Sequence, residues 1–494
     1  MKEATERNAW SLGEPPVSVI LGLPFHDVTF EEAIEECRRL LADSSRTSYL
    51  VTANLDFAAQ AYEDIDLRKI LFYADRVVCD GMPMVWLSRL LGRPLRERVA
   101  GSDMVPRLLA LCAQEEFPVY FFGSDETTLK ECKGLLEQKY EGLQVVGCEA
   151  PPMGAVVEWD NDAIARRIRE SGARLLLLAL GCPKQERWIY AHHQEAGAAL
   201  SIGIGASLDF ITGKQRRAPL WMQKSGTEWI WRMSTDPRRL VARYAKDLVF
   251  LVRASLRQLW SLRKRPLRPS LPESGIEELP EEVILLRWVG EIDRGHLERA
   301  ELPVTLAQPV LCDLSQVTFM DSSGLGCLAQ LARNCRNEGQ SLALLQPSEV
   351  VTRTLVGMKM DSLFEVVASQ EEAEALFEDH RMRPTGTNLN ASKGRVTVTF
   401  GYSLELSTFD DMVETLRRAL AENPDLKELV VDLSGVEFID SRAVGGLIRV
   451  NREVVAAGGK LFLSHPRPSV KETLHLLRLE GILPQLPEEK GEAS

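Results

Sequence analysis

The stretch LLLLALGCPKQERW, residues 175–188, joins an apolar run to a polar segment without a spacer. Six apolar residues are enough for one strand buried on both faces, which is typical of a parallel sheet. Gly181 and Pro183 end the run, and the polar residues 184–187 follow at once. Ligands of parallel sheets bind beyond the carboxyl ends of the strands, so we expect this turn to form one wall of a ligand crevice.

Apolar runs and helix-like stretches alternate through residues 17 to about 215. The pairs include VSVILGLP with FEEAIEECRRLLA, FPVYFFGS with TLKECKGLLEQKY, and LQVVG with DAIARRIRES. Strands that alternate with helices predict a parallel sheet covered by helices on both faces. The first part of the chain is therefore expected to be a Rossmann-like α/β domain.

The length and composition of the chain indicate a soluble protein of several domains. Its 494 residues are too many for a single hydrophobic core, and 45% hydrophobic with 26% charged residues is an ordinary globular composition. The start of the chain has no signal-peptide pattern, and no run of eighteen apolar residues occurs. A cytoplasmic location is expected.

The cysteines and histidines give no sign of a disulfide framework or a metal site. Nine cysteines occur without a CxxC pair, and seven histidines show no metal-ligand spacing. Cys182, in the opening turn, has two interpretations. It is either a nucleophile or a small buried thiol that packs the turn, and we favour the second.

Positive charge is concentrated in residues 216–268, where fourteen Lys and Arg accompany three acidic residues, a local balance of +11. Because the whole chain carries −12, the remainder carries −23. Between Arg239 and Arg257 the cations and the apolar residues fall on opposite sides of a helix. Four tryptophans occur in the basic segment: Trp221, Trp229, Trp231 and Trp260. We expect this basic amphipathic segment to dock on a membrane surface; the alternative is a helix that packs on its own domain.

The C-terminal part of the chain contains two copies of one pattern. LCDLSQVTFMDSSGLG begins at Leu311 and VVDLSGVEFIDSRAVG begins at Val430, an offset of 119 residues that holds without a gap through Leu355 and Leu474. Two copies of one small α/β domain are the simplest explanation.

Separate motifs in the first part of the chain occur in the order TxN, DGMP, RVAGSDM, FFG, LGCPKQE, GxGASLDFITG, RRAP, GTEWIWR and DPRR. Over about residues 17–253, this set resembles the WecG/TagA/CpsF family of bacterial glycosyltransferases. The resemblance implies that a sugar moves from a UDP-sugar, of the hexose or hexosamine type, to a sugar linked to a polyprenyl pyrophosphate. It places this reaction at the inner face of the membrane, in surface polysaccharide synthesis, without a cofactor.

The resemblance assigns the predicted catalytic groups to two strand ends. Inverting glycosyl transfer needs a base that takes the proton of the acceptor hydroxyl, and Asp80 in the DGMP motif matches the candidate base of the family. Thr52 and Asn54 match the TxN site and would orient sugar hydroxyls or phosphate oxygens. The alternatives are an Asp80 that caps a turn, and a Thr52 and an Asn54 that simply end a strand.

Further residues match substrate-binding positions of the family. Arg98 in RVAGSDM is suited to a pyrophosphate, although a solvated surface arginine is the alternative. Gln185 and Glu186 would bind the nucleotide or the donor sugar, and Lys184 would supply charge to a phosphate, at a helix start whose free amides favour anions. GCPKQE alone could also be a plain helix start.

Arginines of the basic segment complete the predicted site. We expect Arg232, Arg239 and Arg243 to bind the leaving phosphate or the lipid surface. Without a metal, the negative charge on the leaving group must be stabilised by arginines and helix dipoles. Asp160-Asn161-Asp162 has the D-x-D spacing of metal-dependent glycosyltransferases. It lies at an expected helix start, where capping carboxylates are common, so no metal is expected.

The two repeats resemble STAS domains, the fold of anti-sigma-factor antagonists. Their phosphoacceptor is the serine after the aspartate of DSSGLG, here Ser322 and, by register, Ser441. In the second copy Arg442 and Ala443 replace Ser323 and Gly324, which puts partner docking in doubt there. A plain helix N-cap is the alternative role of both serines. An anti-sigma-type serine kinase and a serine phosphatase are the implied partners, and no nucleic acid is expected.

The hypothesis is a peripheral membrane glycosyltransferase that two STAS domains regulate. The alternative is a non-catalytic sensor of sugar nucleotides that works as a partner-switch protein. We expect phosphorylation of Ser322 to act on a partner and not on the sugar pocket, because a linker leaves few paths for rigid coupling. The predicted boundaries are 1–215 for the transferase core, 216–265 for the basic amphipathic appendage, 266–281 for a linker, 282–378 for the first STAS domain, 379–393 for a second linker and 394–490 for the second STAS domain.

Overall fold

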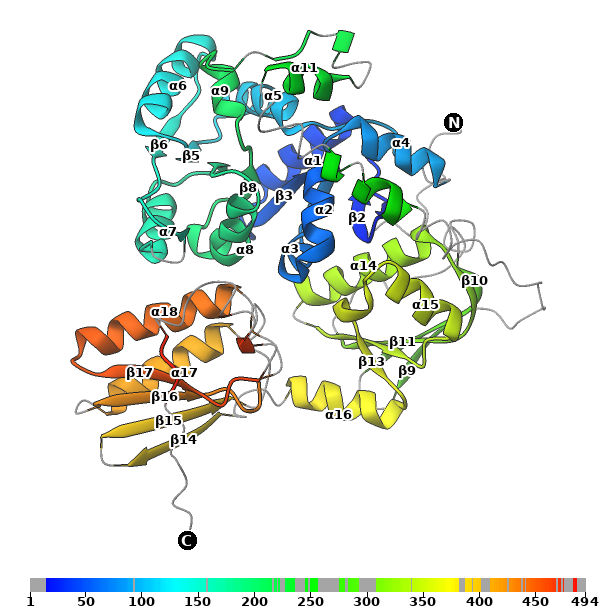
Figure 1. The fold of residues 1–494 in the computed structure, drawn as a ribbon, viewed down its shortest axis with the longest axis vertical. Helices are drawn as coiled ribbons and strands as arrows, with labels where there is room; N and C mark the ends of the chain where they lie inside the picture. The colour runs from blue at the N-terminus through cyan, green and yellow to red at the C-terminus, as the bar shows by residue number, and fades with distance from the viewer. Residues whose placement is uncertain are drawn as a thin grey trace. The chain divides into compact units, whose positions relative to one another are not determined.

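The computed structural model assigns the chain to two compact units (Figure 1). One unit comprises residues 1–153, 162–189 and 193–378, and the other comprises residues 154–161, 190–192 and 379–494. The structure describes residues 15–91, 94–156, 159–215, 217–219, 221–222, 227–235, 245–247, 249–255, 275–279, 283–292, 308–338, 340–381, 387–392, 394–400, 409–423, 426–436, 439, 441–467, 470–471, 474 and 483–486.

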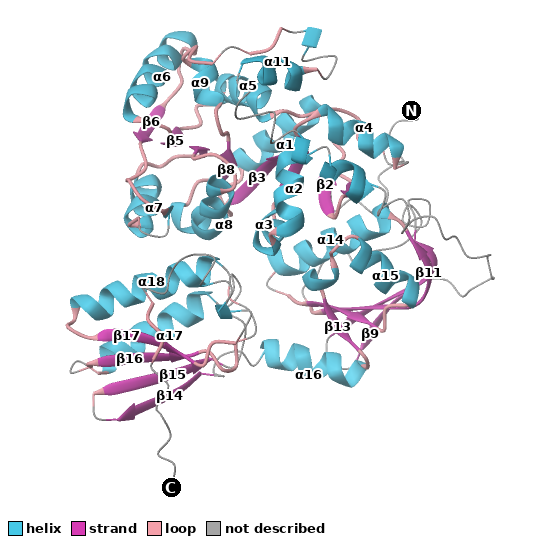
Figure 2. Cartoon of the chain, viewed as in Figure 1, coloured by secondary structure: helices cyan, strands magenta, loops and turns pink. Residues whose placement is uncertain are grey.

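The first domain is built on a six-stranded sheet with the strand order β4-β3-β8-β7-β5-β6. Figure 2 shows strands of this sheet in magenta among cyan helices. Every neighbouring pair in this sheet is parallel. The predicted parallel α/β domain is therefore confirmed. The strands are β3 (Ser48–Ala53), β4 (Arg76–Cys79), β5 (Val119–Gly123), β6 (Val145–Glu149), β7 (Leu175–Ala179) and β8 (Leu200–Gly203).

Helices follow most of these strands, and several of them begin at a side-chain cap. The first, α1, starts with a capping box in which Thr29 and Glu32 each bind the other's backbone amide. Asn54, Asp64 and Asp125 cap α2, α3 and α6 through their side chains. The helices are α1 (Phe30–Ala42), α2 (Leu55–Glu63), α3 (Ile65–Phe72), α4 (Met82–Leu90), α5 (Gly101–Gln114), α6 (Glu126–Lys139), α7 (Asn161–Glu170), α8 (Lys184–Ala196), α9 (Ser207–Ile211) and α11 (Glu228–Thr235).

The apolar run VSVILGLP does not join the parallel sheet. It forms an antiparallel hairpin of its own, β1 (Val17–Ile20) and β2 (Leu23–His26). Leu21 and Gly22 make the turn with φ angles of 54° and 78°, which brings the chain back on itself. The alternation of strands and helices therefore begins with α1 and β3.

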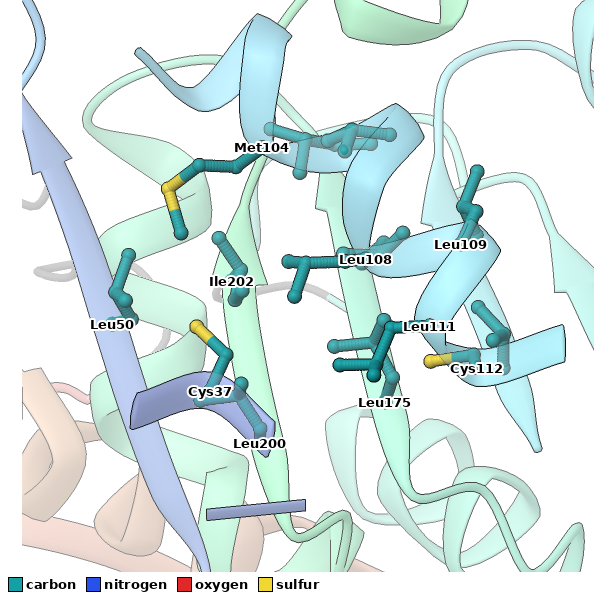
Figure 3. Packing of buried hydrophobic residues seen from close by; sticks show 14 of the residues in the cluster. Cys37, Leu50, Met104, Leu108, Leu109, Leu111, Cys112, Leu175, Leu200 and Ile202 are labelled. Atoms are coloured by element: carbon teal, nitrogen blue, oxygen red, sulfur yellow. The ribbon is translucent and has the colours of Figure 1, made fainter. Parts of the chain in front are cut away.

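A buried apolar cluster on one face of the sheet holds α1 and α5 against the strands (Figure 3). Figure 3 shows Cys37 of α1 and Leu108 of α5 beside Leu50, Leu175 and Ile202 of the strands. All of these side chains are at most 1% exposed. Each buried leucine or isoleucine contributes about 1.5–3 kcal/mol relative to an exposed one, so this face anchors the strand ends that carry the site.

The two repeats have related sheets and one equivalent helix each. The first repeat has the strand order β13-β12-β11-β10-β9 and the second has β14-β15-β16-β17. Helices α14 (Ser322–Asn337) and α18 (Ser441–Ala456) begin and end 119 residues apart, as the sequence offset predicts. The strands are β9 (Gly275–Leu279), β10 (Val283–Ile292), β11 (Val310–Met320), β12 (Leu342–Leu345), β13 (Glu365–Val367), β14 (Thr387–Ser392), β15 (Arg395–Phe400), β16 (Glu428–Asp432) and β17 (Lys460–Ser464), and the other helices are α15 (Glu349–Gly357), the 3-10 helix η2 (Asp361–Leu363), α16 (Gln370–Arg381) and α17 (Phe409–Glu422).

The basic amphipathic segment is described only in pieces, namely residues 217–219, 221–222, 227–235, 245–247 and 249–255. Arg239 and Arg243 lie outside the described residues. Within the described part of the chain, no helix has the length and apolar character needed to cross a bilayer.

Candidate active site

Two adjacent parallel strands bring Thr52, Asn54 and Asp80 to the same edge of the sheet. Thr52 lies in β3, Asn54 follows its end, and Asp80 follows β4, which pairs with β3 in parallel. The Asp80 amide donates to the Ala53 carbonyl oxygen over 2.9 Å, which holds the two strand ends together. The side chains of Thr52 and Asp80 are half-buried, and that of Asn54 is exposed.

Glycines allow the segments around Asp80 to approach closely. Gly81 has a φ of 151°, and a Cβ there would lie 3.8 Å from the Cβ of Asn54. A Cβ on Gly101, the first residue of α5, would lie 3.1 Å from Thr52 Oγ1. The TxN, DGMP and RVAGSDM motifs therefore meet beyond the ends of β3 and β4.

Asn54 has a structural role as a helix cap, which the sequence analysis did not consider. Its Oδ1 accepts a hydrogen bond of 2.9 Å from the Phe57 amide and caps α2. Its amide nitrogen is not needed for this cap. Asn54 can therefore cap α2 and still offer its amide nitrogen as a donor.

Arg98 belongs to a cluster of two arginines and two carboxylates. Its Nη2 lies 2.8 Å from Asp103 Oδ2, and its Nη1 lies 3.4 Å from Glu228 Oε2 at the start of α11. Arg217 Nη1 lies 2.6 Å from the other oxygen of Asp103. The Val99 amide donates to the Cys79 carbonyl over 2.9 Å, which keeps this cluster beside Asp80. Arg98 is thus not the solvated surface arginine of the alternative.

The sequence analysis did not single out Asp103, Arg217 and Glu228 as site residues. Each lies in a quoted motif, RVAGSDM, RRAP or GTEWIWR, so the signal was present. What was missing was their proximity, because Arg98 and Glu228 are 130 residues apart in the chain.

The GCPKQE turn is built as a cross-link between β7 and β8. Gln185 Oε1 accepts from the Gly205 amide over 3.0 Å, and its Nε2 donates to Glu186 Oε1 over 2.7 Å. Both side chains are buried, and Lys184 is exposed. A Cβ on Gly203 would lie 2.4 Å from Gln185 Nε2, so a glycine at the end of β8 makes room for the glutamine.

Glu186 is a buried carboxyl group whose protonation changes near neutral pH. Burial raises its pKa to about 7, and the hydrogen bond from Gln185 offsets part of that effect. Among the described residues, its Oε2 has no hydrogen-bond partner. A buried carboxyl with a pKa near neutrality at the end of a strand is typical of functional sites.

The prediction that Cys182 is buried is wrong. Its side chain is exposed and not buried. Nevertheless, the loss of solvent around its sulfur and the nearby charge of Glu186 raise the pKa of the thiol well above its usual value. The thiol therefore stays protonated at neutral pH, which disfavours a nucleophile.

The remaining predicted residues are placed as follows. Arg232 lies in α11, but its side chain is outside the described residues. Asp160 directly precedes α7, the expected helix start. In the described part of the chain, no group of three or more His, Cys, Asp or Glu side chains could hold a metal ion. Ser322 and Ser441 are the first residues of α14 and α18, and the side chain of Ser441 is not described.

The cap of α14 is provided by the aspartate before Ser322. Asp321 Oδ1 accepts from the Ser323 and Gly324 amides at 2.7 and 3.2 Å. Because Asp321 is the N-cap, Ser322 is not, and the plain-cap alternative for Ser322 is wrong.

Comparison with known proteins follows the same division of the chain. The model described as the "Glycosyl transferase WecG/TagA/CpsF family" matches residues 18–265, half of the chain. The chain belongs to this family. The STAS domain model matches residues 263–373 and 388–493, which confirms both predicted resemblances.

Named relatives of the WecG/TagA/CpsF domain are transferases. The chain is 28% identical over 217 residues to an N-acetylglucosaminyldiphosphoundecaprenol N-acetyl-beta-D-mannosaminyltransferase of Bacillus spizizenii, covering 44% of this chain and 82% of the relative. A protein of the same name in Staphylococcus aureus is 25% identical, covering 45% and 85%. Among solved structures, a putative anti-sigma factor antagonist from Thermotoga maritima is 20% identical, covers 20% of this chain and 83% of that one, and has a TM-score of 0.19.

The raised pKa of Glu186 predicts a pH-dependent stability difference in Glu186→Gln. The folded protein keeps a proton that the unfolded chain loses between pH 4.5 and about 7, so wild-type stability falls as the pH rises through this window. Relative to the variant, we expect wild type to lose roughly 2–3 kcal/mol of unfolding free energy between pH 5 and pH 8.

Urea unfolding of both proteins at the two pH values measures this difference. Glu141→Gln, at an exposed position between α6 and β6, is the control for the loss of one charge. Parallel stability curves for wild type and Glu186→Gln would show that Glu186 is ionised in the folded protein.

Proposed function

We propose that this chain moves a sugar from a UDP-sugar to a lipid-diphosphate-linked acceptor with inversion at the transferred carbon. The observation that carries the proposal is the meeting of Thr52, Asn54 and Asp80 at the ends of two adjacent strands, beside Arg98. The names of the relatives, in which the acceptor is a lipid diphosphate and the transferred group is a hexosamine, favour a UDP-hexosamine as the donor.

Asp80 would act as the general base. Its carboxylate takes the proton from the acceptor hydroxyl while that oxygen attacks the anomeric carbon, and the bond to the UDP oxygen breaks. Thr52 and Asn54 would orient the reacting sugar through neutral hydrogen bonds. Gln185 and Glu186 would hold the donor from the β7 side, because β3, β8 and β7 are neighbours in the sheet.

The negative charge that develops on the leaving UDP would be neutralised by guanidinium groups and not by a metal. Arg98 and Arg217 share the carboxylate of Asp103, so two cations are held together by one anion. A bound diphosphate could exchange with that carboxylate and accept paired hydrogen bonds. Arg232, Arg239 and Arg243 of the basic segment would add charge from the appendage.

Transfer from a panel of UDP-sugars to a lipid-diphosphate-linked N-acetylglucosamine tests this proposal. We expect turnover with a UDP-N-acetylhexosamine and none with the same sugar on a different nucleotide. A protein that binds these donors without transfer or hydrolysis would instead be the non-catalytic sensor.

Membrane association would bring the site to its lipid-linked acceptor, at the inner membrane face. Large apolar side chains are exposed on α4, where Trp86 is 43% and Leu90 is 66% exposed. These two residues are four positions apart and so lie on one face of the helix that follows Asp80. Trp221, Val249 and Val252 of the basic segment are more than half exposed as well.

Neutral replacements of the basic segment should weaken binding to anionic liposomes. We expect Arg232→Gln, Arg239→Gln and Arg243→Gln together to reduce binding at least tenfold at low salt, because each cation near an anionic surface contributes about 1 kcal/mol. The difference should shrink as salt screens the charges. Co-sedimentation at several salt concentrations measures it.

One further variant completes that experiment. The double variant Trp86→Ser and Leu90→Ser should weaken binding to neutral and anionic liposomes alike, since it removes apolar contact and no charge. Equal binding of wild type and the triple arginine variant to anionic vesicles would refute the electrostatic part of the proposal.

Regulation would act through phosphorylation of Ser322, and Ser441 is a second candidate by register. A phosphate changes the local charge by about −1.5 to −2 at a helix N-terminus, where the helix dipole tolerates it. A serine kinase of the anti-sigma type and an opposing phosphatase would be the partners. Mass spectrometry on protein from its own host, with and without the phosphatase, tests this modification.

A further inference from the structure

Helix α14 of the first STAS domain packs directly on the β1–β2 hairpin of the transferase core, within the same compact unit. A Cβ on Gly326 would lie 2.2 Å from the Val17 carbonyl oxygen and 2.9 Å from its carbon. No other residue fits this distance without a shift of the backbone. The contact therefore requires a glycine at this position in the second turn of α14.

The same helix inserts an arginine into the core. Arg333 is 3% exposed, and its Nη1 donates to His26 Nε2 in β2 over 2.9 Å. On its other side, the ring of His26 meets the Val77 backbone, whose amide lies 3.0 Å from Nδ1. Burial, together with Arg333 and Arg76, lowers the pKa of His26 well below its usual value, which keeps the ring neutral.

A second contact joins Lys359, which follows α15, to the transferase core. Lys359 Nζ donates to the Tyr62 carbonyl oxygen over 2.9 Å, and Arg68 Nη1 donates to the Lys359 carbonyl oxygen over 2.5 Å. Phe72 of α3 meets Phe364 edge-on, with ring centroids 5.5 Å apart. Phe72 also belongs to the buried apolar cluster of the first STAS domain, so the two domains share one core.

These contacts correct the expectation that a linker isolates the first STAS domain from the transferase. The contacts between the two domains comprise a buried arginine, one hydrogen bond from a lysine and one from an arginine to backbone carbonyls, and an aromatic pair. All of them join residues that are far apart in the chain. The first STAS domain therefore contacts the transferase core directly, and α14, the helix that begins at Ser322, supplies part of this contact.

Helix geometry places Ser322 on the same side of α14 as Gly326, the residue that meets the hairpin. Ser322 precedes Gly326 by four residues, about one helical turn, so the two point in nearly the same direction. Its side chain is 1% exposed. A phosphoryl group adds three oxygens and nearly two negative charges, for which this close-packed face has no room.

We infer that docking of α14 on the β1–β2 hairpin and a phosphate on Ser322 exclude each other, so that the modification releases the first STAS domain from the transferase. The partner that this surface of α14 fits is thus the transferase core of the same chain. This inference rests on the proposed phosphorylation of Ser322 and does not require the proposed transferase reaction.

The second repeat supplies a matched control. Gly445 is 119 residues after Gly326 and takes the corresponding place in α18. Nothing lies within 4 Å of the position that its Cβ would take. An alanine at position 445 therefore causes no steric clash in α18. An alanine at position 326 collides with the transferase backbone.

Hydrogen exchange of the full-length chain, read by mass spectrometry, tests the inference without any turnover assay. We expect Gly326→Ala and Ser322→Asp each to speed exchange at least tenfold in residues 17–26, 65–72 and 322–337. We expect Gly445→Ala to leave the same peptides unchanged. Unchanged exchange in β15, β16 and β17 is the internal measure that the rest of the chain is folded.

Two results would overturn the inference. Wild-type exchange in Gly326→Ala would show that the hairpin and α14 are not docked in solution. Faster exchange in Gly326→Ala together with wild-type exchange in Ser322→Asp, and in protein phosphorylated at Ser322, would show that docking tolerates the phosphate. Arg333→Gln loses the hydrogen bond to His26 without introducing a steric clash. It should speed exchange in the same peptides, and it replaces Gly326→Ala in the test if that variant does not fold.

Discussion

Asp80→Asn should lower the transfer rate at saturating substrates by about 10²–10⁴-fold. The asparagine has nearly the same volume and keeps a hydrogen-bonding side chain, but it cannot accept the proton of the acceptor hydroxyl. Because the Asp80 backbone, and not its side chain, bonds to Ala53, the strand ends should stay in place. Binding of UDP and thermal stability should therefore be close to wild type.

Single-turnover transfer, with UDP binding measured by calorimetry, separates the chemical step from binding. Asp160→Asn is the matched control, since it makes the same chemical change at an exposed position before α7. It should leave the rate unchanged, and a tenfold loss would favour the metal-dependent alternative for Asp160-Asn161-Asp162. An Asp80→Asn protein that keeps most of its turnover would exclude Asp80 as the base.

Gln185→Ala should lower transfer by about 10²-fold, because a displacement of about 1 Å of a substrate-positioning group is enough for such a loss. The glutamine holds the Gly205 amide and Glu186 Oε1 at once. Without it, both groups are left unpaired in a buried site, which we expect to cost about 1–3 kcal/mol of unfolding free energy.

The expected signature of this variant is a rate loss that exceeds its loss of stability at the assay temperature. Turnover and urea unfolding of the same preparation measure both. Lys130→Ala, on the exposed side of α6, is the control for a surface change. If Gln185→Ala unfolds more easily but keeps wild-type turnover, the turn is a structural cross-link and not part of the donor site.

Local patterns in the sequence were sufficient for the elements that carry the site. The run Leu175–Ala179 is a buried strand and α8 begins at Lys184, as the apolar run and the break at residues 181–183 predict. The offset of 119 residues correctly predicted that α14 and α18 are equivalent helices. Hydrophobic periodicity and caps are encoded within a few residues, and a repeat is found by comparing the sequence with itself. These signals can therefore be read without knowing which segments contact one another in the fold.

Patterns of the same kind failed where the partner of a segment mattered. VSVILGLP has the apolar run of a strand, but nothing in it distinguishes a strand of the parallel sheet from a hairpin. The structure assigns it to β1 and β2 because Leu21 and Gly22 turn the chain back. The hairpin then offers Val17 to a helix more than 300 residues later.

The sequence by itself determined the order of domains, the parallel sheet of the first, and the motifs at its strand ends, because burial periodicity and glycine-rich turns are encoded over a few residues. Only the tertiary structure decided that Asp103 joins Arg98 to Arg217, that Glu186 is buried with a pKa of about 7, and that α14 covers the transferase hairpin. These properties arise from contacts between segments that are distant in the chain, and close packing and desolvation act only where such segments meet.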